Sequence, residues 1–367
     1  MKSFNFFIPT KIIFGKGRIG ELAENISSDY NNILLVTGRK SAKKSGALDK
    51  IGFLLKDKKI FVFDEVEENP SFEVLERGRE IARREKIELI IGVGGGSPMD
   101  AAKGIAILTN NKGSMRDYMK GEKPENKILP IVCIPTTSGT GSEVTPYAVF
   151  TDPDNEDKGG YANPDIFPVF SIIDPELTYT MPENVIINTG IDALTHALEG
   201  YFSTKASILN DYLAIHSIKI IAGNIFDAAE KDKLAMDRIS YASMVAGIVI
   251  ANAGTLLLHA VGYPLTVYHK IPHGLANAIL LPEFISFLKR KSNIKGKIEI
   301  IENIFEPMGG IENFLNEIGI KTKLSAYNIK KEEISVFVQK TIHKKNLLIT
   351  PAKIEEKDLY DFYEETL

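Results

Sequence analysis

Short apolar runs alternate with amphipathic stretches through the first half of the chain. Five runs rich in Ile and Val end at Gly, Pro or Asp, which predicts buried strands at 32–38, 59–64, 89–94, 131–135 and 169–174. Helical spacing fills the intervals, most clearly in 72–86. This alternation predicts a parallel sheet covered by helices on both faces, with ligands bound beyond the carboxyl ends of the strands.

The pattern changes near Pro182. Long segments at helical spacing then dominate, at 185–203, 207–222, 234–262 and 273–290. We therefore predict an α/β domain over residues 1–181 and an all-α domain over 182–367, joined by a hinge at 174–182. A length of 367 residues agrees with two domains.

Composition excludes several classes of protein. A net charge of −4 gives no electrostatic case for nucleic acid. No apolar run approaches the roughly 20 residues of a membrane helix, and the N-terminus lacks the apolar core of a signal peptide. The single cysteine, Cys133, cannot form an intrachain disulfide and lies in an apolar run, where we expect an inert core residue. A cytoplasmic location is expected.

A glycine-rich loop, G-V-G-G-G-S-P-M-D-A-A-K (92–103), follows one predicted strand and opens a helix. Its three consecutive glycines let the backbone approach an anion, while Ser97 suits the N-cap and Pro98 the first turn. The free N–H groups and the helix dipole attract phosphate. The loop departs from the G-x-G-x-x-G fingerprint, since Ser97 takes the third glycine's place. Three glycines exceed the needs of a tight turn, so phosphate binding is favoured.

A second loop, P-T-T-S-G-T-G-S-E-V-T (135–145), follows the next predicted strand of this half. Its hydroxyl groups offer hydrogen-bond donors, and its glycines permit tight curvature. A flexible linker has a similar composition, but this segment directly follows a buried strand. Two anion-binding loops after neighbouring strands suit a pyrophosphate, which points to a dinucleotide.

The segment V-T-G-R-K-S-A-K-K-S-G (36–46) bears on the choice of dinucleotide. Folds that select NAD often carry an acidic residue near such a strand end. Gly38 stands there in this chain, followed by Arg39, Ser41 and Lys43. The alternative is a solvated basic turn. If Gly38 and Ser41 contact the cofactor, the chemistry favours NADP over NAD.

Four residues form a candidate metal site. Asp192 and His196 stand at i and i+4 on one face of a predicted helix, and His259 and His273 follow downstream. A hydrogen-bonded helical pair and a satisfied core histidine are the alternatives. Together, three imidazoles and one carboxylate suit Fe²⁺ or Zn²⁺ with a position left open for substrate.

Two prolines decide how the histidine-rich stretch 259–274 folds. Pro264 is predicted to end the helix that carries His259, and Pro272 to begin a new one with His273 in its first turn. His269 is four residues before His273, the spacing of a helical metal pair, but we place it on the connecting loop near the site.

Taken together, the motifs resemble the iron-containing (group III) alcohol dehydrogenases. The matching pieces are G-G-G-S-P-M-D, P-T-T-S-G-T-G-S-E-V-T, G-I-D-A-L-T-H-A-L-E-G and H-A-V-G-Y-P…I-P-H-G-L-A-N-A, in family order over about residues 5–290. The resemblance implies the fold shared with dehydroquinate synthase, in which an α/β dinucleotide-binding domain and a helical domain enclose the metal. It also implies a homodimer, in which the apolar N-terminal segment F-N-F-F-I-P is expected to form a strand that helps to pair the subunits.

The resemblance also carries over individual residues. It implies metal ligands at Asp192, His196, His259 and His273. It strengthens the NADP interpretation, because members that prefer NAD tend to have Asp at the position of Gly38. The further cofactor contacts that it implies are Asn69, Gly95, Gly96, Ser97, Thr136, Thr137, Thr145, Lys158 and Leu177.

Tyr263 departs from the family pattern. Members often carry a second histidine there, one turn after His259, which is thought to relay protons. A tyrosine has an ordinary pKa of about 10 and is a poor base at neutral pH. We favour an aromatic wall or a hydrogen bond to a ligand over a relay. The candidate proton routes remain Tyr263, His269, the nicotinamide ribose and water.

The predicted function is reversible hydride transfer between NADP(H) and a small alcohol or aldehyde, with diols included. The alternatives are a dehydroquinate-synthase-like lyase, a glycerol-dehydrogenase-like enzyme and a non-catalytic metal- or nucleotide-binding protein. The lyase would need cations for a substrate phosphate, and 250–280 offers only Lys270. No nucleic-acid or membrane partner is expected.

Overall fold

The computed structural model describes residues 3–152, 154 and 157–367. The strands are β1 Lys11–Phe14, β2 Asn32–Gly38, β3 Lys59–Val66, β4 Leu89–Gly94, β5 Ile131–Pro135, β6 Tyr147–Asp152, β7 Asp157–Ala162 and β8 Phe170–Ile173. The helices are α1 Leu22–Asn25, α2 Ser41–Lys44, α3 Ala47–Leu54, α4 Phe72–Arg84, α5 Gly96–Asn110, α6 Met115–Met119, α7 Glu183–Phe202, α8 Ile208–Ala222, α9 Ile225–Ala229, α10 Lys233–Ala253, α11 Leu257–His269, α12 His273–Lys291, α13 Lys295–Phe305, α14 Ile311–Glu317, α15 Ile334–Thr341 and α16 Glu356–Glu365.

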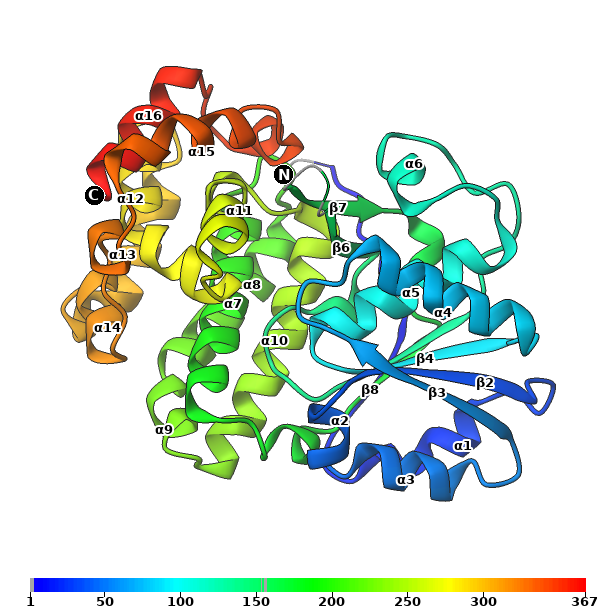
Figure 1. The fold of residues 1–367 in the computed structure, drawn as a ribbon. Coiled ribbons are helices and arrows are strands. Elements are labelled where there is room, and N and C mark those ends of the chain that lie inside the picture. Colours follow the sequence, from blue (N-terminus) through cyan, green and yellow to red (C-terminus); the bar gives the residue numbers. More distant parts are fainter. Residues whose placement is uncertain (1–2, 153, 155–156) are drawn as a thin grey trace.

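Six parallel strands form the sheet of the N-terminal half, in the order β1-β8-β5-β4-β2-β3 (Figure 1). The five predicted strands are confirmed as β2, β3, β4, β5 and β8. The sequence pattern missed β1, a four-residue strand at the edge of the sheet, where it pairs with β8. It also missed the antiparallel hairpin of β6 and β7, which lies outside this sheet.

Alternating side chains of the strands supply two cores, one on each face of the sheet. Leu34 and Val36 of β2 pack with the residues of α4 and α5. Ile33 and Leu35 of the same strand pack on the other face, with α1 and α3. A strand's period of two sends successive side chains to opposite faces, and burial of both explains the nearly continuous apolar sequence.

The strand register brings the predicted loops to one edge of the sheet. Gly94 at the end of β4 is paired with Pro135 at the end of β5. Gly38 at the end of β2 is paired with Val66 at the end of β3. The segments that follow β2, β4 and β5 therefore leave the sheet side by side, at its carboxyl edge.

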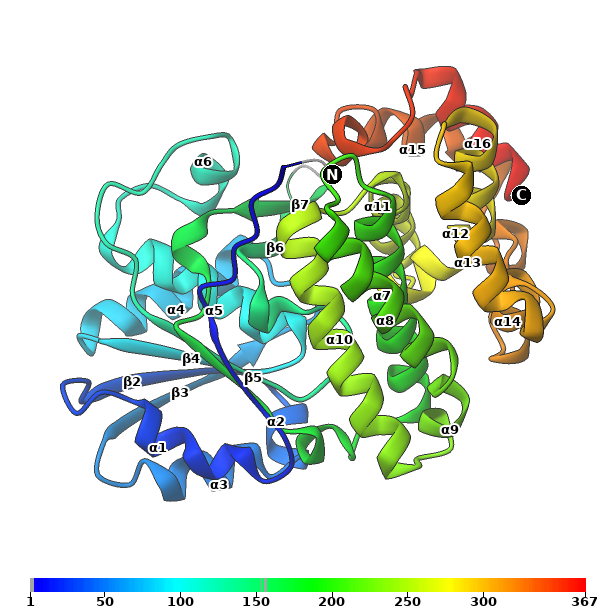
Figure 2. The same cartoon turned by 180° about the vertical axis from the view of Figure 1, so that it is seen from behind.

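Helices alone build the rest of the chain, with α7, α8 and α10 side by side next to the α/β part (Figure 2). The predicted helices 185–203, 207–222 and 273–290 are confirmed as α7, α8 and α12. The predicted boundary at residues 181/182 falls just before α7. Contrary to the sequence-based expectation, α10 is long and apolar enough to cross a membrane, but 67% of its most apolar window is buried inside the protein.

The prediction of one helix over 234–262 is wrong. α10 ends at Ala253 and α11 begins at Leu257. Gly254 separates them with φ of 73°, a left-handed value that favours glycine and ends a helix. The hydroxyl of Ser203 donates to the carbonyl of Ala253 at 2.7 Å, so the end of α10 gains a partner from another part of the chain.

Pro264 lies inside α11 and does not end it, contrary to prediction. A proline removes the hydrogen bond to the carbonyl four residues earlier, here that of Ala260. The Thr341 hydroxyl lies 3.5 Å from this carbonyl, but it donates its proton to the Phe337 carbonyl at 2.8 Å. The Tyr363 hydroxyl donates to the neighbouring carbonyl of Val261 at 2.9 Å. A donor from a C-terminal helix thus reaches the backbone beside the proline, and α11 continues to His269.

The N-terminal segment F-N-F-F-I-P does not form a strand, contrary to prediction. It runs as extended chain, and β1 begins only at Lys11. The Phe7 amide donates to the Asn252 side chain at 2.8 Å, which fastens the segment to α10. Phe4 and Phe7 are 44% and 58% exposed.

Candidate metal and dinucleotide site

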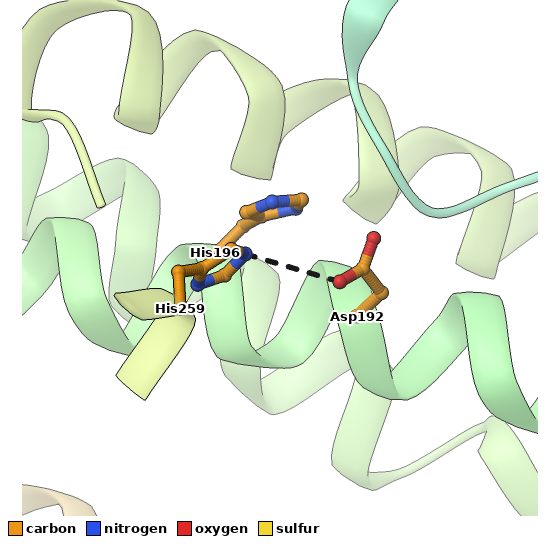
Figure 3. Close-up of side chains that lie close together, drawn as sticks. All are labelled: Asp192, His196 and His259. Carbon is orange, nitrogen blue, oxygen red and sulfur yellow. Dashed lines mark ion pairs between the residues drawn. The ribbon is translucent and has the colours of Figure 1, made fainter. Parts of the chain in front are cut away.

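Three of the predicted ligands meet on the buried side of α7. Asp192 and His196 share one face of that helix, and His259 approaches from α11 (Figure 3). One ligand atom from each lies within 4.8 Å of the others. Burying a carboxylate between imidazoles is costly unless the charges are compensated, so the cluster fits a cation.

His273 brings the fourth set of ligand atoms to the same place. Its Nε2 lies 3.9 Å from Oδ1 of Asp192, and so does Nε2 of His259. Ligand atoms that share Zn²⁺ or Fe²⁺ at about 2.1 Å stand roughly 3–4 Å apart. Nδ1 of His273 has no hydrogen-bond partner within the described part of the chain. His273 therefore stands at ligand spacing from Asp192, beside the group of three whose ligand atoms are all mutually close.

The ring of His196 is held by the loop that follows β5. Its Nδ1 lies 3.2 Å from the carbonyl of Gly139, which accepts its proton. The ring stacks on that of His259 with centroids 4.7 Å apart. Burial lowers the pKa of His196, so the neutral imidazole presents a lone pair on Nε2.

Glu199 orients His259, and the sequence analysis missed it. Its carboxylate accepts from Nδ1 of His259 and from the backbone N–H groups of His259 and Leu256. Burial acts to lower the pKa of His259, but Glu199 outweighs it and the pKa is raised. A carboxylate that fixes the far nitrogen of a metal-binding histidine is a recurring arrangement. The signal was present, since Glu199 follows Asp192 by seven residues on the same helix face.

Asn277 is a second residue that the sequence analysis missed. Its Nδ2 lies 3.3 Å from Nε2 of His259 and 3.5 Å from Oδ1 of Asp192. It belongs to α12, one turn after His273, and it is fully buried. A Cβ on Gly262 would overlap the Asn277 side-chain oxygen, so that glycine makes room for the amide.

The first turn of α12 positions His273. Pro272 is the N-cap and His273 the first helical residue, as predicted. A Cβ on Gly274 would overlap the carbonyl of Asn188 in α7, so only glycine lets the two helices approach this closely. Burial lowers the pKa of His273 well below its ordinary value.

Tyr263 forms an aromatic wall beside the ligands. Its ring stacks on that of His273 with centroids 5.5 Å apart and an interplanar angle of 18°. The ammonium groups of Lys158 and Lys344 lie 5.7 Å and 5.6 Å from its centroid. Tyr263 is therefore next to a ligand, as expected, with two cations against its ring.

His269 points away from these residues. It is the last residue of α11, and the prediction of a loop position is wrong. Its Nε2 bonds Glu333 at 2.7 Å, and its ring packs on Phe337 of α15. Ten residues of helix separate it from His259, which corresponds to about 15 Å of rise. The structure does not bring it to the other histidines.

The glycine-rich loop opens α5 as predicted, although the capping residue differs. Gly95 is the N-cap, so Ser97 lies inside the first turn. The Ser97 hydroxyl accepts from the amide of Asn69 at 3.1 Å. The side-chain oxygen of Asn69 in turn accepts from Lys158 Nζ at 2.7 Å. The structure thus joins three of the predicted cofactor residues into one chain of hydrogen bonds.

The loop after β5 lies against the glycine-rich loop. A Cβ on Gly95 would stand 3.3 Å from the Thr137 hydroxyl, and a Cβ on Gly96 would overlap the Thr140 methyl. Among the described residues, the buried hydroxyls of Thr136 and Ser138 have no hydrogen-bond partner. Such donors beside a helix N-terminus fit the phosphates of a dinucleotide.

The remaining predicted cofactor residues are more scattered. Gly38 and Ser41 are half-buried at the end of β2 and the start of α2. Thr145 is buried, and its carbonyl accepts from Lys103. Leu177 is fully buried in the core on the α1 and α3 face of the sheet. These four residues belong to four different segments of the α/β part.

Known proteins share both parts of this chain. The family described as iron-containing alcohol dehydrogenase matches residues 9–175, and the C-terminal domain of the Fe-containing alcohol dehydrogenase family matches 186–367. An NADPH-dependent butanol dehydrogenase of Clostridium saccharobutylicum is 36% identical over 89% of this chain and 88% of its own. A 1,3-propanediol dehydrogenase of Citrobacter freundii is 32% identical over 99% and 98%. The crystal structure of an iron-containing alcohol dehydrogenase of Thermotoga maritima superposes with a TM-score of 0.91, at 38% identity over 100% of this chain and 99% of that one.

Fold and site together define a metal-dependent oxidoreductase with a dinucleotide-binding domain. The chain belongs to the iron-containing alcohol dehydrogenase family and is an alcohol dehydrogenase. The resemblance drawn from the sequence motifs and the predicted fold class are confirmed.

Proposed function

We propose that this enzyme transfers a hydride between NADP(H) and a short alcohol, diol or aldehyde at an Fe²⁺ centre, with Zn²⁺ as the alternative metal. The observation that carries the proposal is the buried group of Asp192, His196 and His259, whose ligand atoms lie within 4.8 Å of one another, with Nε2 of His273 3.9 Å from Asp192. A carboxylate with three imidazoles would occupy four positions, so an Fe²⁺ ion with a larger coordination number would keep a position for the substrate oxygen.

Two of the ligands are held in orientation by neighbouring groups before any substrate binds. The carbonyl of Gly139 and the carboxylate of Glu199 hold the Nδ1 atoms of His196 and His259, which directs both Nε2 atoms inward. Bound metal supplies a Lewis acid that stabilises an alkoxide or polarises a carbonyl. Tyr263, which is buried and stacked on His273, would help to exclude water from this side of the site.

The contacts of Tyr263 and His269 make both residues poor candidates for carrying the hydroxyl proton. Tyr263 stacks flat on His273, which suits a wall better than a relay. His269 is engaged with Glu333 and far along α11. We therefore propose that the hydroxyl proton leaves through water or the nicotinamide ribose.

Gly38 supports NADP over NAD. No carboxylate stands between Gly38 and Lys44, whereas Arg39, Lys40 and Lys43 are cationic and exposed. A 2′-phosphate is attracted by such cations and would be repelled by an acid at this point. A Cβ on Gly38 would stand 3.2 Å from the Val66 carbonyl, so the segment also has little room for a larger residue. The NADPH dependence named for the clostridial relative agrees with this proposal.

The substrate class rests on the relatives. Two of these relatives are named for butanol and for 1,3-propanediol. Their names support short alcohols, diols and the corresponding aldehydes as substrates of this enzyme. We also propose a homodimer, supported by the exposed Phe4 and Phe7 beside the edge strand β1. A cytoplasmic location is supported by Cys133, a single buried thiol.

The cofactor proposal is tested by steady-state kinetics. Purified enzyme loaded with Fe²⁺ under anaerobic conditions is assayed on butanol, 1,3-propanediol and their aldehydes, with each dinucleotide in turn. We expect kcat/KM for NADPH to exceed that for NADH, and Gly38→Asp to reverse or abolish the preference. An NADH preference in the wild type would contradict the NADP proposal and leave the metal proposal standing.

A further inference from the structure

A fully buried lysine on α5 binds one segment of the loop after β5. Nζ of Lys103 donates to the carbonyls of Ser142, Thr145 and Tyr147 at 2.7, 3.0 and 2.7 Å, and lies 2.9 Å from the Ser142 hydroxyl. All four acceptors belong to residues 142–147. Bonds from an ammonium to carbonyl oxygens are charge-assisted and therefore strong, so this cation holds a single segment in place.

Asp100, one turn earlier on α5, completes the arrangement. Its Oδ1 accepts from the Ser142 hydroxyl at 2.6 Å and its Oδ2 from the amide of Val149 at 2.9 Å. Burial raises the pKa of Asp100 and lowers that of Lys103, while each group opposes the other's shift. The two side chains thus bind the loop and the start of β6 to the helix that carries the glycine-rich turn.

The same loop is pressed against the helical domain from its other side. Gly141 lies against Gly247 of α10, where a Cβ on either residue would overlap the other's backbone. A Cβ on Gly139 would overlap Thr189 of α7. Between these contacts, the Gly139 carbonyl accepts from Nδ1 of His196. The loop therefore has the helix of the phosphate site on one side and a metal ligand on the other.

We infer that Lys103, with Asp100, is a positioning residue that couples the dinucleotide site to the metal site through the 136–145 loop. Lys103 fixes the end of the loop at Ser142 and Thr145. Earlier in the loop, the hydroxyls of Thr136 and Ser138 then face the cofactor. The carbonyl of Gly139 faces His196. Loss of the clamp is expected to weaken both sites together, although Lys103 touches neither. This inference rests on the metal and cofactor assignments proposed above.

The test compares apo-protein variants for two affinities. Asp100→Asn/Lys103→Met removes both charges of the pair together, and of the neighbouring acids the buried Glu143, whose pKa burial raises and Lys103 acts to lower, stays in place. Gly247→Ala keeps those charges and displaces the loop from the opposite side. Co²⁺ affinity is measured by chelator competition, NADPH affinity by fluorescence titration, and the Co²⁺ absorption spectrum reports the geometry of the ligands. We expect the affinities for Co²⁺ and for NADPH to fall about tenfold in each variant, the size of effect known for residues that orient a metal ligand without binding the metal. The Co²⁺ absorption spectrum should also change.

Arg83→Met is the matched control. Arg83 also donates to three main-chain carbonyls, those of Leu108, Thr109 and Asn111, but at the far end of α5. We expect a lower Tm with both affinities and the Co²⁺ spectrum unchanged.

Two outcomes overturn the inference, and they are distinguishable. Wild type that binds Co²⁺ and NADPH, with the loop variants within threefold in both affinities, would show that Lys103 only supports folding. Wild type that binds neither ligand would overturn the proposed function and this inference together.

Discussion

Glu199 of α7 accepts a hydrogen bond from the imidazole of His259 in α11. The carboxylate accepts the Nδ1 proton of His259 and also two backbone N–H groups at the start of α11. One buried acid thus sets both the ring orientation of a ligand and the place where its helix begins. The fold therefore orients two of the ligands, His196 and His259, through hydrogen bonds to their Nδ1 atoms.

Removal of the Glu199 charge is expected to weaken metal binding. Glu199→Gln keeps the shape but offers a weaker acceptor to Nδ1. We expect metal affinity to fall about 10–100-fold, measured by chelator competition. Glu283→Gln removes an acid of α12 that pairs with Arg290, and serves as the control with unchanged affinity. An unaltered affinity in Glu199→Gln would show that His259 keeps its orientation without the carboxylate.

Tyr263→Phe tests the aromatic wall against the proton relay. The variant keeps the ring that stacks on His273 and loses only the hydroxyl. We expect kcat to stay within about threefold and the pH profile to keep its shape. A relay contributes roughly 10²–10⁴-fold, so a loss of that size with a shifted profile would establish Tyr263 as a proton carrier.

His269→Ala belongs to the same series. His269 bonds Glu333 and lies along α11 from the ligands. We expect a lower Tm, from the lost contact with α15, and unchanged kcat. A fall in kcat comparable with that of a ligand variant would place His269 in the reaction.

Gly274→Ala tests the close approach of α12 to α7. An added Cβ would overlap the backbone of Asn188, so the first turn of α12 must move and carry His273 with it. We expect a large loss of metal affinity, measured by chelator competition, together with a lower Tm. Gly296→Ala is the matched helical control, because a Cβ there meets no atom within 4 Å. It should stabilise the protein by about 1 kcal/mol. Equal behaviour of the two variants would refute the packing argument.

Lys158 gives the cofactor affinity a pH dependence. Burial lowers its pKa to about 8, although Asp192 acts in the opposite direction. The ammonium that bonds Asn69 is therefore lost above about pH 8, and the Kd for NADPH should rise there. The free energy of unfolding should rise over the same range of pH. The reason is that the unfolded chain binds more protons than the folded protein between about pH 8 and the ordinary pKa of 10.5.

The control for this titration is a lysine outside the site. Lys158→Met should weaken NADPH binding at pH 7 and remove the rise in Kd above pH 8. Lys289→Met, on the exposed face of α12, should retain the wild-type titration. A wild-type Kd that stays constant from pH 7 to about 9.5 would contradict a role for the Lys158 charge.

Local sequence patterns predicted five of the six strands of the sheet and placed Asp192 and His196 on one helix. Val and Ile runs predicted β2, β4, β5 and β8, because burial on both faces leaves a continuous apolar signal. Asp192 and His196, at i and i+4, lie on one face of α7, as their spacing predicts. By contrast, α11 continues through Pro264 where Tyr363, which is far away in sequence, donates to its backbone. No local rule reveals donors supplied by tertiary contact.

Other misses had a local signal that was not used. Glu199 stands seven residues after Asp192, on the same face, and a buried acid there calls for a partner. Gly254 in the sequence N-A-G-T could have ended a helix, but its apolar neighbours favoured continuation. The wrong prediction of a loop position for His269 followed from the wrong prediction that Pro264 ends the helix. Because α11 continues to His269, the imidazole reaches Glu333.

The most direct test of the account is the metal content of ligand variants. Anaerobically reconstituted wild type should hold a single Fe²⁺ per chain and oxidise butanol or 1,3-propanediol with NADP⁺. Asp192→Ala, His259→Ala and His273→Ala should each lose the metal and at least about 100-fold in kcat/KM, while NADPH binding in fluorescence titrations persists. Undiminished Fe²⁺ content and turnover in these variants would contradict the central claim that these side chains form the catalytic metal site.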